Sequence, residues 1–241
     1  MAPAPVRRFL TAEWRFLALL NYAVEPALLA PHAPRGTELD VHAGRVLLSL
    51  VGFRFIHTRL LGVAIPRHRH FDEVNLRCYV RRTAGGEVRR GVAFIREIVP
   101  LRAVAWVANT LFGERYISLP MRYVEAGDAT ALRTAYHWWY KSRWNSISLK
   151  AAGRSVALQE GSQEEFITEH FWGYAKAGAN RTNEYQVAHP RWAIYPVVEC
   201  LVDCDFGRLY GPAFANLGER RPQSAFLAEG SAIEVYKKKR L

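Results

Sequence analysis

The stretch of residues 71–123 constrains the fold of this chain most, because it contains two strand-like segments that carry charges where strands usually carry none. Successive residues of a strand point to opposite faces. In residues 71–80 one face therefore gathers apolar side chains, and the other gathers a polar row that includes Glu73, Asn75 and Arg77. Such a row either faces solvent or lines the inside of a barrel, and the alternation alone leaves both readings open.

The second segment, residues 91–100, has apolar residues on both faces and one charge on each. Arg96 lies on one face and Glu97 lies on the other. A lone buried charge is costly, so at least one of these two side chains needs an ion-pair partner or a ligand. The pattern is typical both of a structural ion pair at a strand end and of a binding site. The Gly85-Gly86 pair between the two segments predicts a hairpin.

The remainder of the chain predicts a mainly antiparallel α+β fold. Apolar spacing after a capping Thr11 predicts a helical N-terminus. The S-x-x-E capping box at Ser162 and Glu165 predicts a later, peripheral helix, and residues 206–217 predict a short helical or irregular segment. Further strands are expected over residues 46–60, 132–140, 144–149, 184–189, 192–202 and 224–236. Many short strands with one or two peripheral helices favour a closed or strongly curved antiparallel sheet.

The length and composition fit one globular domain over residues 1–241. Half of the 241 residues are hydrophobic and 23% are charged, which supplies enough apolar side chains for a large core. The formal net charge of +11 would suit a polyanion or an anionic membrane surface. The basic residues are scattered, however, and no recognised nucleic-acid-binding module accompanies them, so nucleic-acid binding is not expected.

The cysteines and the N-terminus indicate a cytoplasmic protein without a metal site. Cys78, Cys200 and Cys204 are odd in number and do not form a disulfide framework, which fits a reducing compartment. No histidine–cysteine cluster accompanies them, and no zinc site or other cofactor is predicted. The sequence shows no signal-peptide pattern and no apolar run of the roughly 18 residues that a membrane span needs.

Several long segments, in this order, resemble one bacterial family. They read FDEVNLRCYV, GVAFIREIVP, GERYISLPM, GSQEEFITEHFWGY, EYQVAHPRWAIYP and SAFLAEGS. These segments are similar to the YqjF family, the domain of unknown function 2071, and the resemblance extends over residues 11–235. The family has no assigned biochemical role. Its fold is grouped with acetoacetate decarboxylase, so the resemblance implies an acetoacetate decarboxylase-like β-barrel with a central cavity open to small molecules. The same analogy makes a homo-oligomer plausible, although the sequence itself does not indicate one.

The resemblance carries over the cavity but not the decarboxylase reaction. Those enzymes use a lysine that forms a Schiff base and whose pKa is lowered by a neighbouring cation. In the matching segment Pro120 aligns with the motif proline, Met121 stands where the lysine should be, and Arg122 stands where its lysine neighbour should be. Methionine cannot form an imine, and none of the lysines of the chain lies in the central stretch.

The sequence thus predicts a small-molecule ligand, anionic or a carbonyl acid, in a charged and aromatic central pocket. Glutamates such as Glu97 and Glu114 are the candidate acid–base groups, and arginines would hold a carboxylate by paired hydrogen bonds. The candidate ligand-binding residues are Glu73, Arg96, Glu97, Glu114, Met121, Arg122 and Glu229.

Three hypotheses of function remain open: a non-catalytic binding protein, an enzyme that uses glutamate acid–base chemistry on a carbonyl or carboxylic acid, and a surface-interaction protein that uses its basic face. A second group of residues also contains titratable side chains, namely Glu169, His170, Glu184 and His189. Glu169 and His170 are adjacent on a helix, so only one of them can face a pocket.

Overall fold

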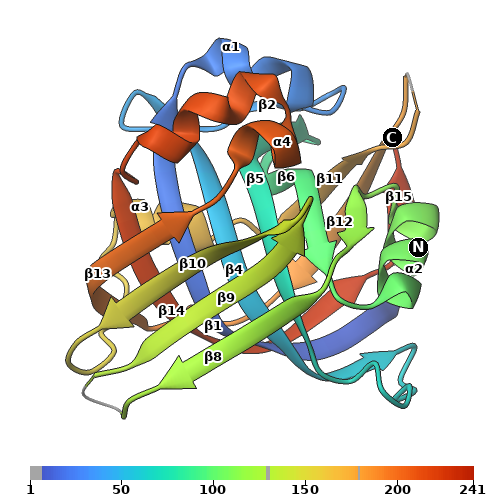
Figure 1. Cartoon of the computed structure of the whole chain (residues 1–241). Helices are drawn as coiled ribbons and strands as arrows, with labels where there is room; N and C mark the ends of the chain where they lie inside the picture. The colour runs from blue at the N-terminus through green and yellow to red at the C-terminus, as the bar shows by residue number, and fades with distance from the viewer. Residues whose placement is uncertain (1–6, 129–130, 179) are drawn as a thin grey trace.

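The computed structural model describes residues 7–128, 131–178 and 180–241, and long antiparallel strands dominate it (Figure 1). In the order in which they neighbour one another, these strands are β6 (Glu87–Val99), β5 (Phe71–Ala84), β4 (Arg45–Leu60), β1 (Arg8–Val24) and β14 (Ser224–Tyr236). The predicted hairpin joins β5 to β6, and Gly85 and Gly86 both have the positive φ that such a two-residue turn requires.

Two further strands close the sheet on itself. Strand β11 (Trp172–Lys176) runs parallel to β6 and pairs with β12 (Thr182–Ala188). Strand β12 in turn pairs with the far end of β14 through Val187 and Val235. The sheet is therefore a ring, and the side chains on its inner face are enclosed rather than exposed to solvent.

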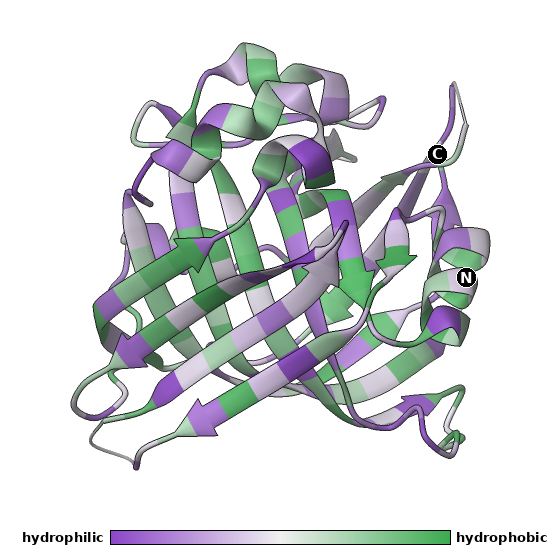
Figure 2. Cartoon of the chain, in the orientation of Figure 1, coloured by the Kyte–Doolittle hydropathy of each residue, from purple (hydrophilic) through white to green (hydrophobic). Residues whose placement is uncertain are grey.

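The rest of the sheet continues from β14 and lies against the outside of the ring. It consists of β13 (Ile194–Asp203), β10 (Arg143–Ala151), β9 (Arg133–Tyr140) and β8 (Met121–Ala126), which lie in front of the ring in Figure 1. We call these four strands the outer sheet. Their inner side chains, such as Trp138 and Ile147, pack against Leu50 and Leu76 of the ring. Their other side chains face solvent, so polar and apolar residues alternate along them (Figure 2).

The helical segments lie at the periphery. Segments α1 (Pro26–Leu29), η1 (Ala30–His32), α4 (Phe206–Tyr210) and η2 (Pro212–Glu219) cover one end of the molecule, at the top of Figure 1. Helix α2 (Arg102–Phe112) lies beside the ring, and α3 (Gln163–Thr168) begins at the predicted cap, where the Ser162 hydroxyl accepts a hydrogen bond from the Glu165 backbone N–H. The short strands are β2 (Glu38–Leu39), β3 (Val41–His42), β7 (Tyr116–Ser118) and β15 (Lys239–Arg240).

The predicted helical N-terminus is wrong, because the residues that follow Thr11 belong to strand β1. This strand pairs on both sides, and Leu19, for example, lies between Val51 of β4 and Phe226 of β14. It is buried on both faces: Leu19 packs inside the ring, whereas Leu20 packs against the outer sheet. A strand that is apolar on both faces has no clear alternation, so a helical spacing can be found in it by coincidence.

Candidate functional site

A cavity of about 270 Å³ lies inside the ring of strands. Its volume is close to the lower end of the range for small-molecule sites. Most of its wall is apolar, and the apolar lining includes Phe9, Trp14, Phe53, Phe55, Phe71, Val92, Phe94, Val104, Val107, Phe112, Val187 and Val235. A small set of polar side chains interrupts this wall. Most of them come from β5, β6, β7, β12 and the segments that precede β7 and β11, and Thr58 of β4 and His68 of the loop before β5 complete the set.

Three glutamates share the cavity wall. Glu73 comes from β5, Glu97 from β6, and Glu114 from the segment between α2 and β7. Glu73 and Glu97 are 2% and 1% exposed. Glu97 is turned inward by a register shift in the β5–β6 pairing, which adds one residue to β6 between Phe94 and Arg96. The shift therefore places Glu97 with Phe94 on the cavity face.

Each of the three carboxylates is held by hydrogen bonds rather than by a cation. Glu73 accepts one from the Asn75 amide at 2.9 Å and one from the Tyr116 hydroxyl at 2.8 Å. Glu97 accepts one from the Arg115 backbone N–H at 3.3 Å. Glu114 accepts one from the Tyr185 hydroxyl at 2.6 Å. Within the described residues, none of the three forms an ion pair.

Tyr185 reaches Glu114 because residue 173 is a glycine. A Cβ at Gly173 would lie 2.1 Å from Cζ of Tyr185, so the tyrosine ring occupies the space that a side chain would fill. The two residues are cross-strand partners in the β11–β12 pair. The close approach of strand and ring thus directs the hydroxyl towards the carboxyl group.

The glutamates hold protons more tightly than free carboxyl groups do. Burial raises the pKa of Glu73 to about 7 and the pKa of Glu114 to about 7. The pKa of Glu97 is raised well above its usual value by burial and by the charges of Glu114 and Glu73. The three groups titrate together, so the cluster carries at least one proton at neutral pH and can both donate and accept hydrogen bonds.

Arg77 is the buried cation of the same cavity. It follows Glu73 and Asn75 along the inner face of β5, and its residue is 9% exposed. Its guanidinium group lies 5.6 Å from the centre of the Tyr79 ring. Its buried Nε has no hydrogen-bond partner, and no carboxylate among the described residues forms an ion pair with it. A buried guanidinium group without a counterion is expensive, which makes this position suited to an anionic ligand.

A histidine–aspartate pair borders the cavity as well. His170 lines the cavity, and its Nε2 lies 3.2 Å from Oδ2 of the buried Asp40, which also contacts Arg90. Burial lowers the pKa of His170. Burial raises the pKa of Asp40, but the hydrogen bond and charge of His170 and the charge of Arg90 outweigh it and lower the pKa overall. The pair links β2–β3 to the end of α3 and holds the His170 ring at the wall.

The structure brings together only part of the predicted site. Glu73, Glu97 and Glu114 line the cavity, and the polar row of β5 faces the inside of the ring. Arg96 lies on the opposite face of β6, where its guanidinium group donates to the Leu209 carbonyl oxygen of α4. The register shift that turns Glu97 inward also turns Arg96 away from the cavity.

The remaining candidates belong to the outer sheet and to β14. Met121 packs at the edge of the core between ring and outer sheet. Arg122 is exposed on β8 and lies 3.7 Å from the centre of the Trp144 ring. Glu229 donates its backbone N–H to the Ala193 carbonyl oxygen, and its side chain does not line the cavity. The sequence analysis missed Tyr116, Tyr185, Asn75, Arg77 and Asp40 as site residues.

The described part of the chain shows no metal-binding cluster, no disulfide and no membrane-spanning helix. Among the described residues, no group of three histidine, cysteine or acidic side chains has the arrangement of a metal site. The cysteines Cys78, Cys200 and Cys204 are free thiols. Within the same described part of the chain, no helix is both long and apolar enough to cross a bilayer.

Comparison with known proteins identifies both a sequence family and a fold. The sequence model of the family DUF2071, described as an uncharacterized conserved protein, matches residues 11–232. No curated protein matches the sequence. An acetoacetate decarboxylase-like enzyme from Sphingomonas wittichii RW1 superposes with a TM-score of 0.67 at 12% identity, over 100% of this chain and 96% of that chain.

Two other solved structures have the same fold. The enduracididine biosynthesis enzyme MppR, complexed with pyruvate, gives a TM-score of 0.64 at 11% identity and covers 99% of this chain and 92% of its own. The acetoacetate decarboxylase from Legionella pneumophila gives 0.63 at 13% identity and covers 99% and 88%. The expected acetoacetate decarboxylase-like fold is therefore confirmed, with the mainly antiparallel sheet that the sequence predicts.

Proposed function

The chain belongs to the DUF2071 family, and from that premise we propose that it binds a small organic acid inside the ring of strands. One observation carries this proposal: Arg77 and the three glutamates share one apolar cavity, yet Arg77 forms no ion pair with any of them. Burial raises the pKa of Glu73 and the charge of Arg77 lowers it by a smaller amount, but the two side chains form no ion pair, which leaves the guanidinium group available to a ligand. The fold is shared with MppR, which has been solved with pyruvate bound.

Arg77 is the group that would hold the carboxylate of the ligand. A guanidinium group offers paired donors that match the two oxygens of a carboxylate, and such a pair is stronger in a cavity that excludes water. The surrounding phenylalanine and valine side chains would cover the apolar part of the acid.

The glutamate cluster would then face a second polar group of the same ligand. Because the cluster retains protons at neutral pH, it can donate a hydrogen bond to a carbonyl or hydroxyl oxygen. Asn75 lies between Glu73 and Arg77 on β5. Its side-chain oxygen has no partner among the described residues, so it can accept a hydrogen bond from the ligand. An oxo or hydroxy acid has both groups: a carboxylate for Arg77, and a carbonyl or hydroxyl oxygen for the glutamates.

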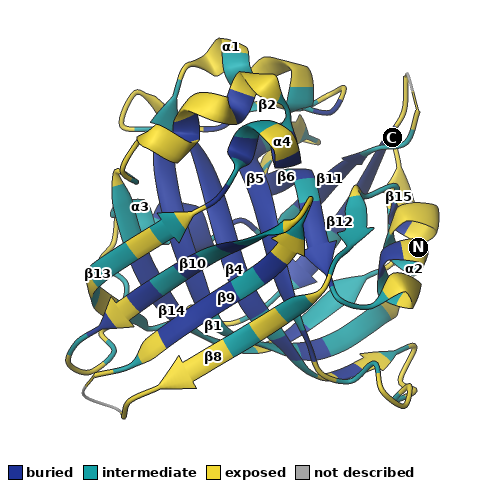
Figure 3. Cartoon of the chain, in the orientation of Figure 1, coloured by how far each residue is buried: buried dark blue, intermediate teal, exposed yellow. Residues whose placement is uncertain are grey.

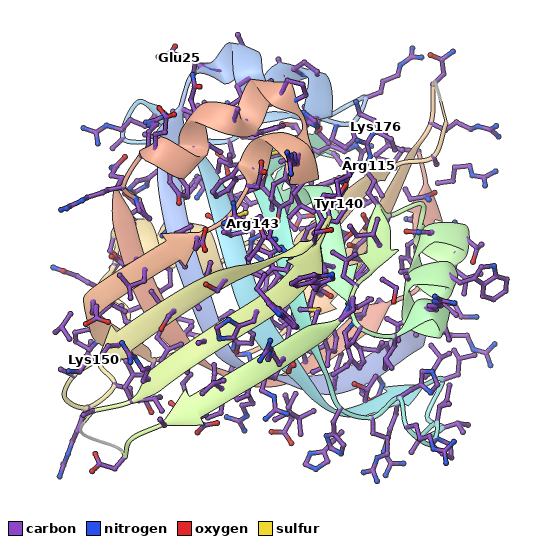
Figure 4. The ribbon with its side chains drawn as sticks, in the orientation of Figure 1. Glu25, Arg115, Tyr140, Arg143, Lys150 and Lys176 are labelled. Atoms are coloured by element: carbon purple, nitrogen blue, oxygen red, sulfur yellow. The ribbon has the colours of Figure 1, made fainter. Side chains whose placement is uncertain are left out.

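The function that we propose does not use an imine. Its lining, as far as the structure describes it, contains no lysine, and Met121 lies in the outer core instead. Lys176 donates to the Pro31 carbonyl oxygen and lies near Arg115 at the upper right of Figure 4, whereas Lys150 lies at the far end of the outer sheet. The resemblance described above, in which Met121 takes the position of the Schiff-base lysine, supports the same proposal.

A second function, proton-transfer catalysis, is favoured by the pKa values of the cluster. A general acid or base works best when its pKa lies near the operating pH, and Glu73 and Glu114 both have a pKa of about 7. A bound acid with a carbonyl group next to a C–H bond would offer a proton to the ionised member of the cluster. The protonated member would donate a hydrogen bond to the carbonyl oxygen.

Calorimetric titration of the purified chain with pyruvate and longer 2-oxo acids tests the binding proposal. We expect binding to the wild type and at least a tenfold weaker affinity for Arg77→Met, since charge-assisted bonds contribute about 1.5–3 kcal/mol. Arg122→Met is the matched control, because it removes an exposed arginine of the outer sheet. Equal affinities of wild type and Arg77→Met would contradict the assignment.

Native mass spectrometry of the gently purified protein gives a test that does not presuppose the acid. A bound small mass that is present in the wild type and in Arg122→Met, and absent in Arg77→Met, would support the cavity as the binding site. Turnover of a carbonyl acid that Glu97→Gln abolishes, while binding survives, would establish the catalytic function.

A further inference from the structure

The lining of the cavity includes two surface segments that expose large apolar side chains. One is the loop of residues 61–70 between β4 and β5, and the other is helix α2. Ile65 and His68 of the loop line the cavity together with Val104 and Val107 of α2. We call these two segments, with their exposed side chains, the rim.

The two halves of the rim are held next to each other by the start of β1. The Leu61 backbone N–H donates to the Phe9 carbonyl oxygen at 2.8 Å. The Phe9 ring packs edge-on against Phe112 at the end of α2, with 4.7 Å between the ring centres. Phe9 also lines the cavity. The loop and the helix therefore both contact the start of β1, and α2 lies on the right-hand side of Figure 1.

The apolar side chains of the rim point away from the core. Val63 is 63% exposed and Trp106 is 68% exposed, and Leu61, Ile65 and Leu111 are also among the exposed large hydrophobic residues. In Figure 3 the same surface of α2 is coloured as exposed. An exposed group of this kind next to a cavity is typical of an interaction surface.

The charges of the rim have one sign. The rim contains the exposed residues Arg67 and Arg102, and the exposed Arg59 lies two residues before its loop; residues 59–70 and 101–112 contain no aspartate or glutamate. None of these three arginines forms an ion pair within the described part of the chain; Arg59 donates only to the Gly62 carbonyl oxygen. Nearby, Glu13 is already paired with Arg15 and His57.

We propose that the rim docks on an anionic membrane surface. Aliphatic and tryptophan side chains interleaved with arginines match the boundary between acyl chains and negatively charged headgroups. A second copy of this chain is less favoured as the partner, because the rim arginines of two copies would repel each other. Docking would place the cavity-lining residues Ile65 and Val104 of the rim close to the bilayer. The proposal does not depend on the identity of the cavity ligand.

Flotation of the full chain with lipid vesicles tests the docking surface. We expect the chain to bind vesicles of phosphatidylcholine mixed with phosphatidylglycerol and to leave vesicles of phosphatidylcholine alone. The double variant Arg67→Glu/Arg102→Glu should lower partitioning by about tenfold or more, because each cation near an anionic surface contributes roughly 1 kcal/mol, a factor of about five. Val63→Ser/Trp106→Ser should also lower partitioning, because these side chains would no longer insert into the apolar part of the bilayer.

Two control variants separate docking from net charge and from general loss of apolar surface. Arg35→Glu/Arg154→Glu changes the net charge equally, and both of its residues are exposed and lie outside the rim. Val198→Ser/Leu201→Ser removes exposed apolar side chains from the outer sheet. Both controls should bind anionic vesicles like the wild type.

Three results would overturn the proposal. The first is that the wild type does not bind anionic vesicles. The second is that the Arg35→Glu/Arg154→Glu control loses as much binding as Arg67→Glu/Arg102→Glu. The third is a dimer, seen by sedimentation velocity without lipid, that Val63→Ser/Trp106→Ser converts to a monomer. That outcome would assign the rim to a second copy of this chain.

Discussion

Strand β5 of the ring and strand β8 of the outer sheet both carry an arginine among alternating apolar residues, yet the two arginines have opposite surroundings. Arg77 is buried in a cavity and has no counterion among the described residues. Arg122 is exposed and lies over the face of Trp144. The difference comes from the sheet: β5 belongs to a ring whose inner face is enclosed, whereas β8 ends the outer sheet (Figure 3).

The comparison teaches that alternation identifies a polar face but not what the face adjoins. The ring closes through the pairing of Val187 with Val235, far from β5 in sequence. Only this pairing decides that the polar row of β5 lines a cavity. In the outer sheet no such closure occurs among the described strands, so an equivalent row faces water.

The largest expected contrast is in the pH dependence of stability. Glu73 has a folded-state pKa of about 7 against an ordinary value of 4.5, so the folded protein keeps this proton when the unfolded chain has lost it. The free energy of unfolding therefore falls as the pH rises from about 4.5 to about 7, by up to about 3 kcal/mol for this group. Glu73→Gln should remove that loss and be more stable than the wild type at about pH 8.

Urea denaturation of the wild type and the variant across this pH range measures the effect. Glu125→Gln provides the control, because Glu125 is an exposed carboxylate of β8. Its free energy of unfolding should stay within about 0.5 kcal/mol of the wild type at each pH. If the free energies of unfolding of the wild type and Glu73→Gln changed with pH in parallel, the ring would not be raising the pKa of Glu73.

A smaller effect is expected from filling the space at Gly173. An added methyl group would lie 2.1 Å from Cζ of Tyr185, and the displaced ring would lose its 2.6 Å bond to Glu114. Gly173→Ala should therefore lower the free energy of unfolding by about 2 kcal/mol. Thermal unfolding can compare it with Gly218→Ala in η2, where the nearest atom, a carbonyl oxygen, lies at an ordinary 3.4 Å. A similar melting temperature for both variants would be the contrary result.

The sequence predicted the elements whose signals are local. The Gly85-Gly86 hairpin, the cap at Ser162 and the strands over residues 46–60 and 224–236 all depend on neighbouring residues, and all are present. The N-terminal strand was missed, because its identity depends on pairing with β4 and β14 on either side. Ring closure depends on tertiary pairing in the same way.

The sequence analysis selected the three glutamates that line the cavity, but it did not select the cavity arginine, Arg77. Glu73, Glu97 and Glu114 stood out as charges among apolar residues, and all three line the cavity. Arg96 was a candidate because it interrupts an apolar row, and a regular alternation does not contain the register shift in β6 that turns it away from the cavity. Arg77 belonged to a polar row that could equally have faced solvent. A bulge of one residue leaves no clear mark in a sequence that is apolar on both faces. The Asp40–His170 pair joins residues far apart in the chain and had no local signal.

The smallest expected effects come from replacing each of the two arginines by methionine. The free energy of unfolding should change in opposite directions in the two variants. Without a ligand, Arg77→Met replaces a buried cation that has no ion-pair partner among the described residues by an apolar side chain of similar length. It should raise the free energy of unfolding by about 1 kcal/mol. Arg122→Met removes the cation from the Trp144 face and should lower it by about 0.5 kcal/mol. Chemical denaturation of the ligand-free proteins measures both, and a decrease for Arg77→Met would mean that the folded chain already satisfies this guanidinium group.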